Sequence, residues 1–428
     1  MMQIKITSLS CSGEGIGTHE GVKVFVPNVL PGEEVEVELT EKKKKYWRGK
    51  QNKILSYAKE RASPKCPLFG QCGGCQIMHL NYPDQLLTKQ TRVIEALRRI
   101  GNLEIEVAPT LPSPLQFGYR NKIQLPVLFD GSEARVGLFR KNTHEFVSID
   151  QCSIHCAIGD KVLQTLLPLI QNKQSLRYIL IKSAPLNQET LVIFVTRKTG
   201  ELQKIANQLM EQCPQVKGVI ENINPQETNT ILGKTFNILK GNAFITEKIL
   251  NKNFLIPANA FFQVNSQMAE ILFQTALQFA KIQPHETVID AFCGVGTLSL
   301  FASDIAKTVI GIEVTHSAID YARINGKLNK AENVDFFCGK SEELLHRFKK
   351  ADVIFLNPPR KGCEPSLIQA IHQLKPRALV YISCDPATLA RDIARLNSYR
   401  ATKIQPLDLF PQTMHVETIA LLECVNAL

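Results

Sequence analysis

The stretch that decides the fold is TVIDAFCGVGT, residues 287–297. The apolar run over residues 287–292 predicts a strand, Gly294 and Gly296 predict a turn, and a helix is expected to begin at Thr297. Open parallel sheets bind nucleotides at such a turn, beyond the carboxyl end of a strand. Taken alone, the stretch is equally compatible with a glycine turn that only packs a helix on a strand.

The residues around this turn favour a nucleoside ligand without a pyrophosphate. The third glycine of a dinucleotide fingerprint would fall at Ser299, so the stretch is not that fingerprint. Glu313 follows Asp290 by 23 residues and ends the next predicted strand, where its carboxylate can hold ribose hydroxyls. An acidic residue before the turn, a close backbone approach at the glycines and a ribose-binding carboxylate together fit S-adenosylmethionine.

Helices and strands alternate on both sides of the turn. The pattern predicts helices over residues 266–280, from 297, over 317–328 and over 365–373, and strands over 287–292, 308–314, 334–338, 352–357 and 378–383. Strands separated mostly by single helices, with near-continuous apolar runs, predict a parallel sheet covered on both faces. We therefore predict an α/β, Rossmann-like domain over residues 251–428.

The preceding sequence divides into two further units. Residues 1–60 predict short strands over 2–9, 22–27 and 33–40, with turns at 13–17 and 31–32, and therefore an N-terminal β-barrel. The basic run 42–50 contains two aromatic residues, so it can pair with phosphates and stack on a base, or form a solvated hairpin. Residues 61–250 predict an α+β central domain, with helices over 84–100 and 202–212.

Composition sets broad limits on the class of protein. The chain has 428 residues, 44% of them hydrophobic, which excludes a fibrous or wholly disordered protein. Its net charge of +10 fits a polyanionic partner such as nucleic acid. Because the sequence shows neither a long apolar window nor a signal peptide, we expect a cytoplasmic protein without membrane contact. Twelve cysteines in a reducing compartment are then not a disulfide framework.

Two motifs follow strands at the carboxyl edge of the predicted sheet. Asn357-Pro358-Pro359 is similar to the tripeptide of amino-group methyltransferases, which place an aromatic residue next to stack on the target base; Arg360 stands there instead. The second motif, SCDPATLARD over residues 383–392, contains Cys384. A thiolate that adds to carbon 6 of uracil makes carbon 5 reactive toward a methyl sulfonium.

A base must then remove the proton from carbon 5 so that the thiol can leave. Glu417 is the candidate for this step. The alternatives are an inert buried thiol at Cys384 and a surface carboxylate at Glu417.

A separate set of cysteines has the spacing of metal ligands. Cys66, Cys72 and Cys75 form a triplet, and Cys152 follows much later, with Cys156 as a competing fourth ligand. Four thiolates can hold either zinc or a cubane iron–sulfur cluster. Zinc ribbons usually contribute two close pairs, so the spacing favours iron–sulfur.

Five motifs together resemble the RNA uracil-5-methyltransferase family, which forms 5-methyluridine in ribosomal and transfer RNA. They are FQVN (262–265), DAFCGVGTLSL (290–300), NPPRKG (357–362), SCDPATLARD (383–392) and HVET (415–418). Residues 1–60, with GEGIG and VFVPNVLPGE, resemble the OB-like TRAM barrel at the start of the ribosomal members. The resemblance extends over the whole chain.

The resemblance implies a role for each matching residue. Cys384 would be the nucleophile and Glu417 the base. The cofactor contacts would be Gln263, Phe292, Glu313 and Asn357. Family members commonly carry Asp at the position of Asn357. We add Thr297, where many members carry Asn.

The ribosomal branch also implies that Cys66, Cys72, Cys75 and Cys152 hold a [4Fe–4S] cluster, which would be structural or shape the RNA site because the uracil reaction moves no electrons. The sequence thus predicts a monomeric, S-adenosylmethionine-dependent 23S ribosomal RNA (uracil-5-)-methyltransferase. The alternatives are a transfer-RNA uridine methyltransferase, an amino-group base methyltransferase, and a non-catalytic RNA-binding or redox scaffold.

Overall fold

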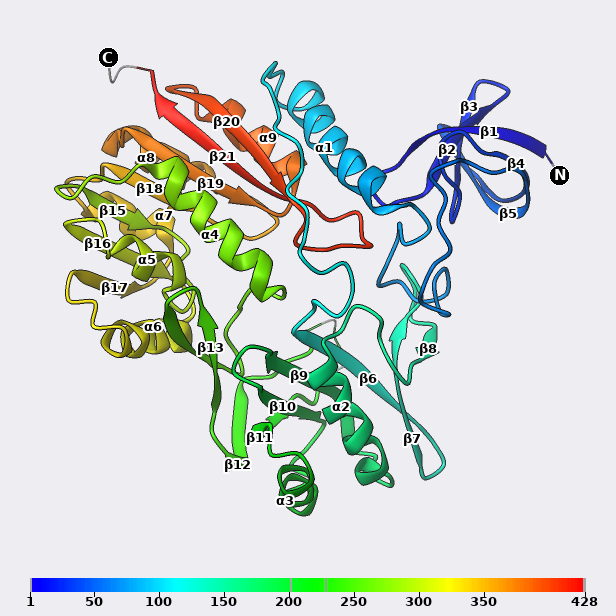
Figure 1. Ribbon diagram of the computed structural model, residues 1–428, viewed down its shortest axis with the longest axis horizontal. Helices are drawn as coiled ribbons and strands as arrows, with labels where there is room; N and C mark the ends of the chain where they lie inside the picture. Colours follow the sequence, from blue (N-terminus) through cyan, green and yellow to red (C-terminus); the bar gives the residue numbers. More distant parts are fainter. Residues whose placement is uncertain (1, 201, 227, 229, 426–428) are drawn as a thin grey trace.

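The N-terminal unit is a small barrel, as predicted. The structure is a computed structural model that describes residues 2–200, 202–226, 228 and 230–425. Five strands close into a barrel in the order β1-β2-β3-β5-β4 (Figure 1). Their bounds are β1 (Met2–Leu9), β2 (Gly15–His19), β3 (Val22–Val26), β4 (Glu34–Lys42) and β5 (Tyr46–Ser56).

The segment GEGIG forms a different structure from the predicted turn. We expected a turn over residues 13–17, but β2 begins at Gly15. A Cβ at Gly15 would lie 2.5 Å from the Val29 side chain, and one at Gly17 would lie 2.2 Å from Ile4. These two glycines therefore allow close packing inside the barrel, and only Gly13, with a φ of 80°, serves the turn.

The basic run forms the β4–β5 hairpin. Lys44 and Lys45 are exposed at its tip. Trp47 packs partly against the barrel core, with Lys42 Nζ 4.8 Å from the centroid of its ring, and Arg48 pairs with Glu14 at 2.6 Å. This arrangement favours the interpretation of the basic run as a solvated hairpin, because the Trp47 ring packs on the barrel instead of being free to stack on a base.

The central unit contains a seven-stranded sheet in the order β12-β11-β10-β9-β6-β7-β8. Only β10 and β11 pair in parallel. The strands are β6 (Lys122–Asp130), β7 (Glu133–Phe139), β8 (Phe146–Ser148), β9 (Leu176–Ala184), β10 (Glu189–Thr196), β11 (Val216–Ile223) and β12 (Thr235–Gly241). Helices α2 (Ala157–Leu166) and α3 (Gln203–Gln212) pack on this sheet, α3 close to its predicted place, and the short helix η1 (Leu167–Ile170) follows α2.

The C-terminal unit has the predicted Rossmann-like sheet with one difference. Its order is β17-β16-β15-β18-β19-β21-β20, and the first five strands are parallel. The last two strands, β20 (Tyr399–Leu407) and β21 (Glu417–Cys424), run antiparallel to their neighbours, and the sequence did not predict them. The parallel strands are β15 (Thr287–Asp290), β16 (Thr308–Glu313), β17 (Val334–Cys338), β18 (Val353–Leu356) and β19 (Ala378–Ser383).

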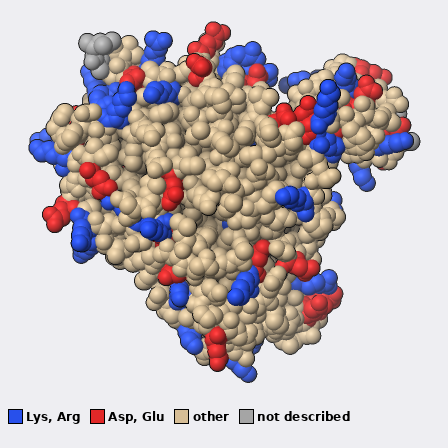
Figure 2. Space-filling model, viewed as in Figure 1, with Lys and Arg blue, Asp and Glu red and all other residues tan. Residues whose placement is uncertain are grey.

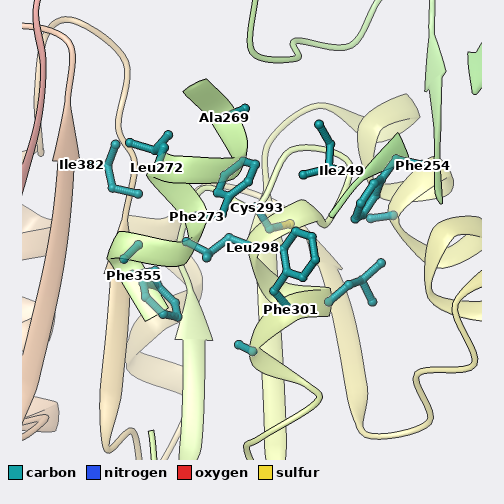
Figure 3. Close-up of a cluster of buried hydrophobic side chains, with 14 of the residues drawn as sticks. Ile249, Phe254, Ala269, Leu272, Phe273, Cys293, Leu298, Phe301, Phe355 and Ile382 are labelled. Carbon is teal, nitrogen blue, oxygen red and sulfur yellow. The ribbon is translucent and has the colours of Figure 1, made fainter. Parts of the chain in front are cut away.

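Helices cover both faces of this sheet (Figure 1). They are α1 (Tyr82–Arg99), α4 (Ser266–Ala280), α5 (Thr297–Ala302), α6 (His316–Leu328), α7 (Ser341–Leu344), η2 (Leu345–Arg347), α8 (Pro365–Leu374) and α9 (Pro386–Arg395). Figure 3 shows Phe273 of α4 close to Leu298 of α5, with Leu272 beside Ile382 and with Phe355 below them.

The two predicted domains, residues 61–250 and 251–428, share buried apolar cores. Val93 and Leu97 of α1 belong to the core between the C-terminal sheet and α9, although α1 lies in the earlier segment. The hairpin of β13 (Phe244–Ile249) and β14 (Lys252–Pro257) packs against the central sheet and against helices α4 and α6 of the C-terminal unit, in one core with Ile193 and Val288. The two units are therefore held together by shared apolar contacts.

The surface carries charges of both signs. On the face in Figure 2, Lys and Arg side chains are interspersed with Asp and Glu rather than gathered in one patch. No helix in the described part of the chain is long and apolar enough to cross a membrane.

Candidate active site

A cavity of ≈1060 Å³ lies at the carboxyl edge of the C-terminal sheet. Four of the five parallel strands deliver a predicted residue to it: Phe292 follows β15, Glu313 ends β16, Asn357 follows β18 and Cys384 follows β19. Gln263 and Glu417 complete the set. Six of the predicted residues therefore share one cavity, where open α/β sheets place their ligands.

The seventh residue, Thr297, lies elsewhere. It is buried in the first turn of α5 and is not among the described residues that line the cavity. Gly296, the residue before it, has a φ of 86°, and a Cβ there would lie 2.9 Å from the Phe336 ring. The turn thus needs glycine for its backbone conformation and for its packing.

Carboxylates shape the side of the cavity next to this turn. Glu313 accepts hydrogen bonds from the backbone N–H of Gly294 (3.3 Å) and of Thr315 (2.8 Å), so its position is fixed at the end of β16. Asp290 accepts a hydrogen bond from Ser299 Oγ (2.7 Å), and burial raises its pKa to about 6. A fixed carboxylate beside a glycine turn suits the ribose of a nucleoside.

The segment that carries Gln263 is held by the central sheet. Asn121 Nδ2 donates to Gln263 O (3.0 Å) and to Ser266 Oγ (2.9 Å). The buried Lys182 donates through Nζ to Pro257 O (2.9 Å) and Ala260 O (2.7 Å). Sequence reasoning missed both residues, because each contacts a segment far away along the chain.

Strand register brings Cys384 and Glu417 together. In the antiparallel pair β19–β21, the last paired residues are Ser383 and Thr418, so Cys384, just beyond β19, and Glu417, the first residue of β21, both adjoin this pair. Both residues line the same cavity, and the charge of Glu417 acts on the Cys384 thiol. The antiparallel end of the sheet, which the sequence did not predict, therefore creates this pairing.

The surroundings set the protonation of these two groups. Glu417 is 4% exposed, and burial raises its pKa to about 8, while Arg360 acts in the opposite direction. Burial and the neighbouring Glu417 raise the pKa of the Cys384 thiol, whereas Arg360 lowers it through its charge and a hydrogen bond. Cys384 also precedes Asp385, the N-cap of α9, where the helix dipole favours a thiolate.

Residues of α9 fix the loop that carries Arg360. Asp392 Oδ2 accepts hydrogen bonds from the backbone N–H of Cys363 (2.7 Å) and from Tyr381 OH (2.8 Å). Arg391 donates through Nη2 to Lys361 O (2.7 Å). The second half of SCDPATLARD therefore holds the NPPRKG loop beside Cys384.

A second cavity, of ≈390 Å³, contains the cysteine set. Cys66, Cys72, Cys75 and Cys152 all line it, whereas the buried Cys156 does not. Burial, together with the charges of the other three thiols, raises the pKa of Cys75. The four side chains thus face a common space.

In the described part of the chain, no three His, Cys, Asp or Glu side chains stand close enough to hold one metal ion. Four thiolates that face one space could hold either zinc or a cubane cluster.

The two cavities are neighbours. Five residues line both of them: Arg120, Gln124, Arg360, Phe410 and His415. Burial and four surrounding cations lower the pKa of His415 to about 4, so its ring is neutral at pH 7. A group bound by the cysteines would stand directly behind the wall of the catalytic cavity.

The sheet, the glycine turn and the carboxylate at the end of β16 define an S-adenosylmethionine-dependent methyltransferase. Comparisons with known proteins identify the family. The sequence profile described as tRNA (Uracil-5-)-methyltransferase matches residues 81–425, and that of the TRAM domain matches residues 1–51. The chain belongs to this uracil-5-methyltransferase family and begins with a TRAM domain.

Individual relatives match over nearly their whole length. An uncharacterized RNA methyltransferase of Clostridium tetani is 38% identical and covers 97% of this chain and 95% of its own. One of Listeria innocua is 36% identical, with 98% and 97% covered. The crystal structure of Pyrococcus abyssi tRNA (uracil-54, C5)-methyltransferase with S-adenosyl-L-homocysteine has a TM-score of 0.79 and 30% identity, and covers 98% of this chain and 99% of its own.

Proposed function

We propose that this RNA methyltransferase methylates carbon 5 of a uridine through a covalent bond between Cys384 and carbon 6. The observation that carries the proposal is that Cys384 and Glu417 adjoin the last pair of β19 and β21 and share one cavity with Glu313 and Asn357. A thiol just beyond the end of β19 and a carboxyl group at the start of β21, which accepts a proton in its ionised form, supply the nucleophile and the proton acceptor that the reaction needs.

The chain's own residues account for each step. The Cys384 thiolate bonds to carbon 6, and the electron pair of the ring double bond moves toward carbon 5. S-adenosylmethionine, when bound, supplies the methyl group to that carbon. Glu417 then takes the proton from carbon 5, and the electron pair of the broken C–H bond re-forms the double bond and expels the Cys384 thiolate. Arg360, hydrogen-bonded to Cys384, favours the thiolate at the first and last steps.

The uracil must leave its stack to reach this cavity. A base inside a helix cannot present carbon 6 to a thiolate, so a uridine flipped out of a loop is the substrate we propose. The amino-group alternative has less support, because Arg360 occupies the position of the stacking aromatic residue and contacts the thiol.

For the target RNA, we propose a uridine of 23S ribosomal RNA. This proposal rests on the four cysteines Cys66, Cys72, Cys75 and Cys152, a set that resembles that of the ribosomal branch of the family. The barrel no longer favours this choice, because the Pyrococcus abyssi tRNA enzyme matches the chain over 98% of its length. That similarity makes transfer RNA the second candidate. The expectations of a monomer and of a cytoplasmic location stay predictions, which sedimentation and cell fractionation would test.

We also propose that Cys66, Cys72, Cys75 and Cys152 hold a [4Fe–4S] cluster, supported by their shared cavity. When bound, the cluster would supply a rigid link between the triplet loop and Cys152 rather than electrons. Anaerobically purified protein should then contain about four irons per chain, and stoichiometric zinc would contradict the assignment.

The test of the function uses RNA from cells that lack the gene. The purified protein and labelled S-adenosylmethionine are incubated with separated ribosomal and transfer RNA, and the digested nucleosides are identified. We expect labelled 5-methyluridine from ribosomal RNA and none with Cys384→Ala. Label in transfer RNA alone would select the second candidate. Cofactor binding without any labelled 5-methyluridine would refute the function.

A further inference from the structure

A buried polar face of α1 contacts the loop that leads into Glu417. This loop, residues 408–416, joins β20 to β21. Gln85, Lys89 and Arg92 follow one another at helical spacings of four and three, so they lie on the same side of α1. Gln85 is 1% exposed and Lys89 is fully buried. Polar side chains are seldom buried in a helix unless they make specific contacts.

The three side chains form hydrogen bonds with every second residue of loop 408–416, from Asp408 to Met414. Lys89 Nζ donates to the Asp408 carboxylate and to Phe410 O (3.0 Å). Gln85 accepts a hydrogen bond from Gln412 N (3.0 Å) and donates to Gln412 Oε1 (3.0 Å).

Arg92 Nη1 donates to Met414 O. The contacts therefore fall at positions 408, 410, 412 and 414, along the whole loop. They leave little freedom to a segment that would otherwise be a connection between two strands.

The loop is also part of the catalytic cavity. Phe410 and His415 line it, and Glu417 follows immediately. The cofactor residues Gln263, Glu313 and Asn357 come from other elements. A displaced loop would thus disturb the wall around the uracil without reaching the glycine turn.

The other half of α1 packs on the helix that follows the nucleophile. Val93 and Leu97 share a core with Leu389 and Ala390 of α9, the helix that begins directly after Cys384. One helix thus contacts both the element behind the thiol and the loop before the base (Figure 1).

We infer that α1 is a positioning helix for methyl transfer: Gln85, Lys89 and Arg92 hold loop 408–416 so that Phe410, His415 and Glu417 face the uracil beside Cys384. The inference rests on the proposed function. A purely structural role for these side chains would stabilise the fold without a separate effect on the chemical step.

Two variants test the inference, with Thr91→Ala as an exposed control on the same helix. Gln85→Leu removes both contacts with Gln412, and Lys89→Met removes those with Asp408 and Phe410. In each folded variant we expect faster hydrogen exchange at residues 409–415, S-adenosylmethionine affinity within about twofold of the wild type, and methyl transfer at saturating cofactor at least about tenfold slower, equivalent to about 1.4 kcal/mol. The control should match the wild type.

Lys89→Met leaves a buried carboxylate, so it can fail to fold; Gln85→Leu, which creates no unpaired charge, then decides. Wild-type transfer rates in a folded Gln85→Leu protein, or unchanged exchange in the loop, would overturn the inference. A wild-type protein that binds the cofactor but forms no 5-methyluridine would instead refute the proposed function, and the exchange data would still show whether α1 anchors the loop.

Discussion

Glu417→Gln should trap the protein on its RNA. The substitution keeps the size of the side chain and removes the proton acceptor that releases the product. General bases contribute about 10²–10⁴-fold to such steps, so breakdown of the covalent adduct should slow by about 100-fold or more, while its formation continues. The adduct should therefore accumulate and survive a denaturing gel.

The buried carboxyl group adds a pH dependence with a definite sign. With a pKa of about 8, Glu417 is roughly one-tenth ionised at pH 7 and roughly nine-tenths ionised at pH 9. Only the ionised form accepts the proton, so adduct breakdown in the wild type should rise about tenfold between pH 7 and pH 9. In Glu417→Gln it should stay slow and flat.

The assay follows the decay of a preformed protein–RNA adduct after a chase with unlabelled RNA, at several pH values. Because the adduct already exists, the measured rate reports product release and not the attack of the thiolate on carbon 6. Control decays are measured with Thr91→Ala, which is remote from the carboxylate. A Glu417→Gln adduct that decays at the wild-type rate, or wild-type decay that is independent of pH over this range, would show that another group is the base.

Three further predictions address other parts of the structure. Burial raises the Glu417 pKa from 4.5 to about 8, so ionisation of this group destabilises the folded protein increasingly as the pH rises from 4.5 to 8, and the effect is constant above that range. In urea unfolding at pH 7, Glu417→Gln should therefore be more stable than the wild type by about 3 kcal/mol or less. Equal stability of the two proteins at all pH values would argue against the burial effect. Lys182→Met loses two hydrogen bonds to the segment before Gln263, so calorimetry should show S-adenosylmethionine affinity about tenfold weaker, with the exposed Lys240→Met unchanged; wild-type affinity would refute this role. Cys152→Ser should lose the iron that Cys156→Ser keeps, because only Cys152 lines the cysteine cavity, and the opposite result in metal analysis would exchange their roles.

Local patterns were sufficient for the elements that build the cofactor side. The helix predicted over residues 266–280 has the bounds of α4, and the strand predicted over residues 334–338 has those of β17. These elements have clear apolar periodicity and turn residues at their ends, which are properties of the local sequence.

The parts that depend on long-range contacts could not be predicted in this way. Glu417 could be proposed from HVET, but its place near Cys384 follows from the antiparallel pairing of β21 with β19, which no local pattern specifies. The buried Lys89 and Lys182 look like ordinary polar residues in sequence, and only their distant carbonyl partners reveal why they are tolerated inside. Thr297 is buried in the first turn of α5 and is not among the described residues that line the cavity, so its role as a cofactor contact stays a prediction.

The most direct test of the central claim is to locate the covalent bond itself. Glu417→Gln is incubated with S-adenosylmethionine and substrate RNA, digested with protease and nuclease, and the cross-linked peptide is identified by mass spectrometry. We predict a methylated uridine attached to the peptide that contains Cys384. Methylated RNA without such an adduct, or an adduct on a different cysteine, would contradict the account.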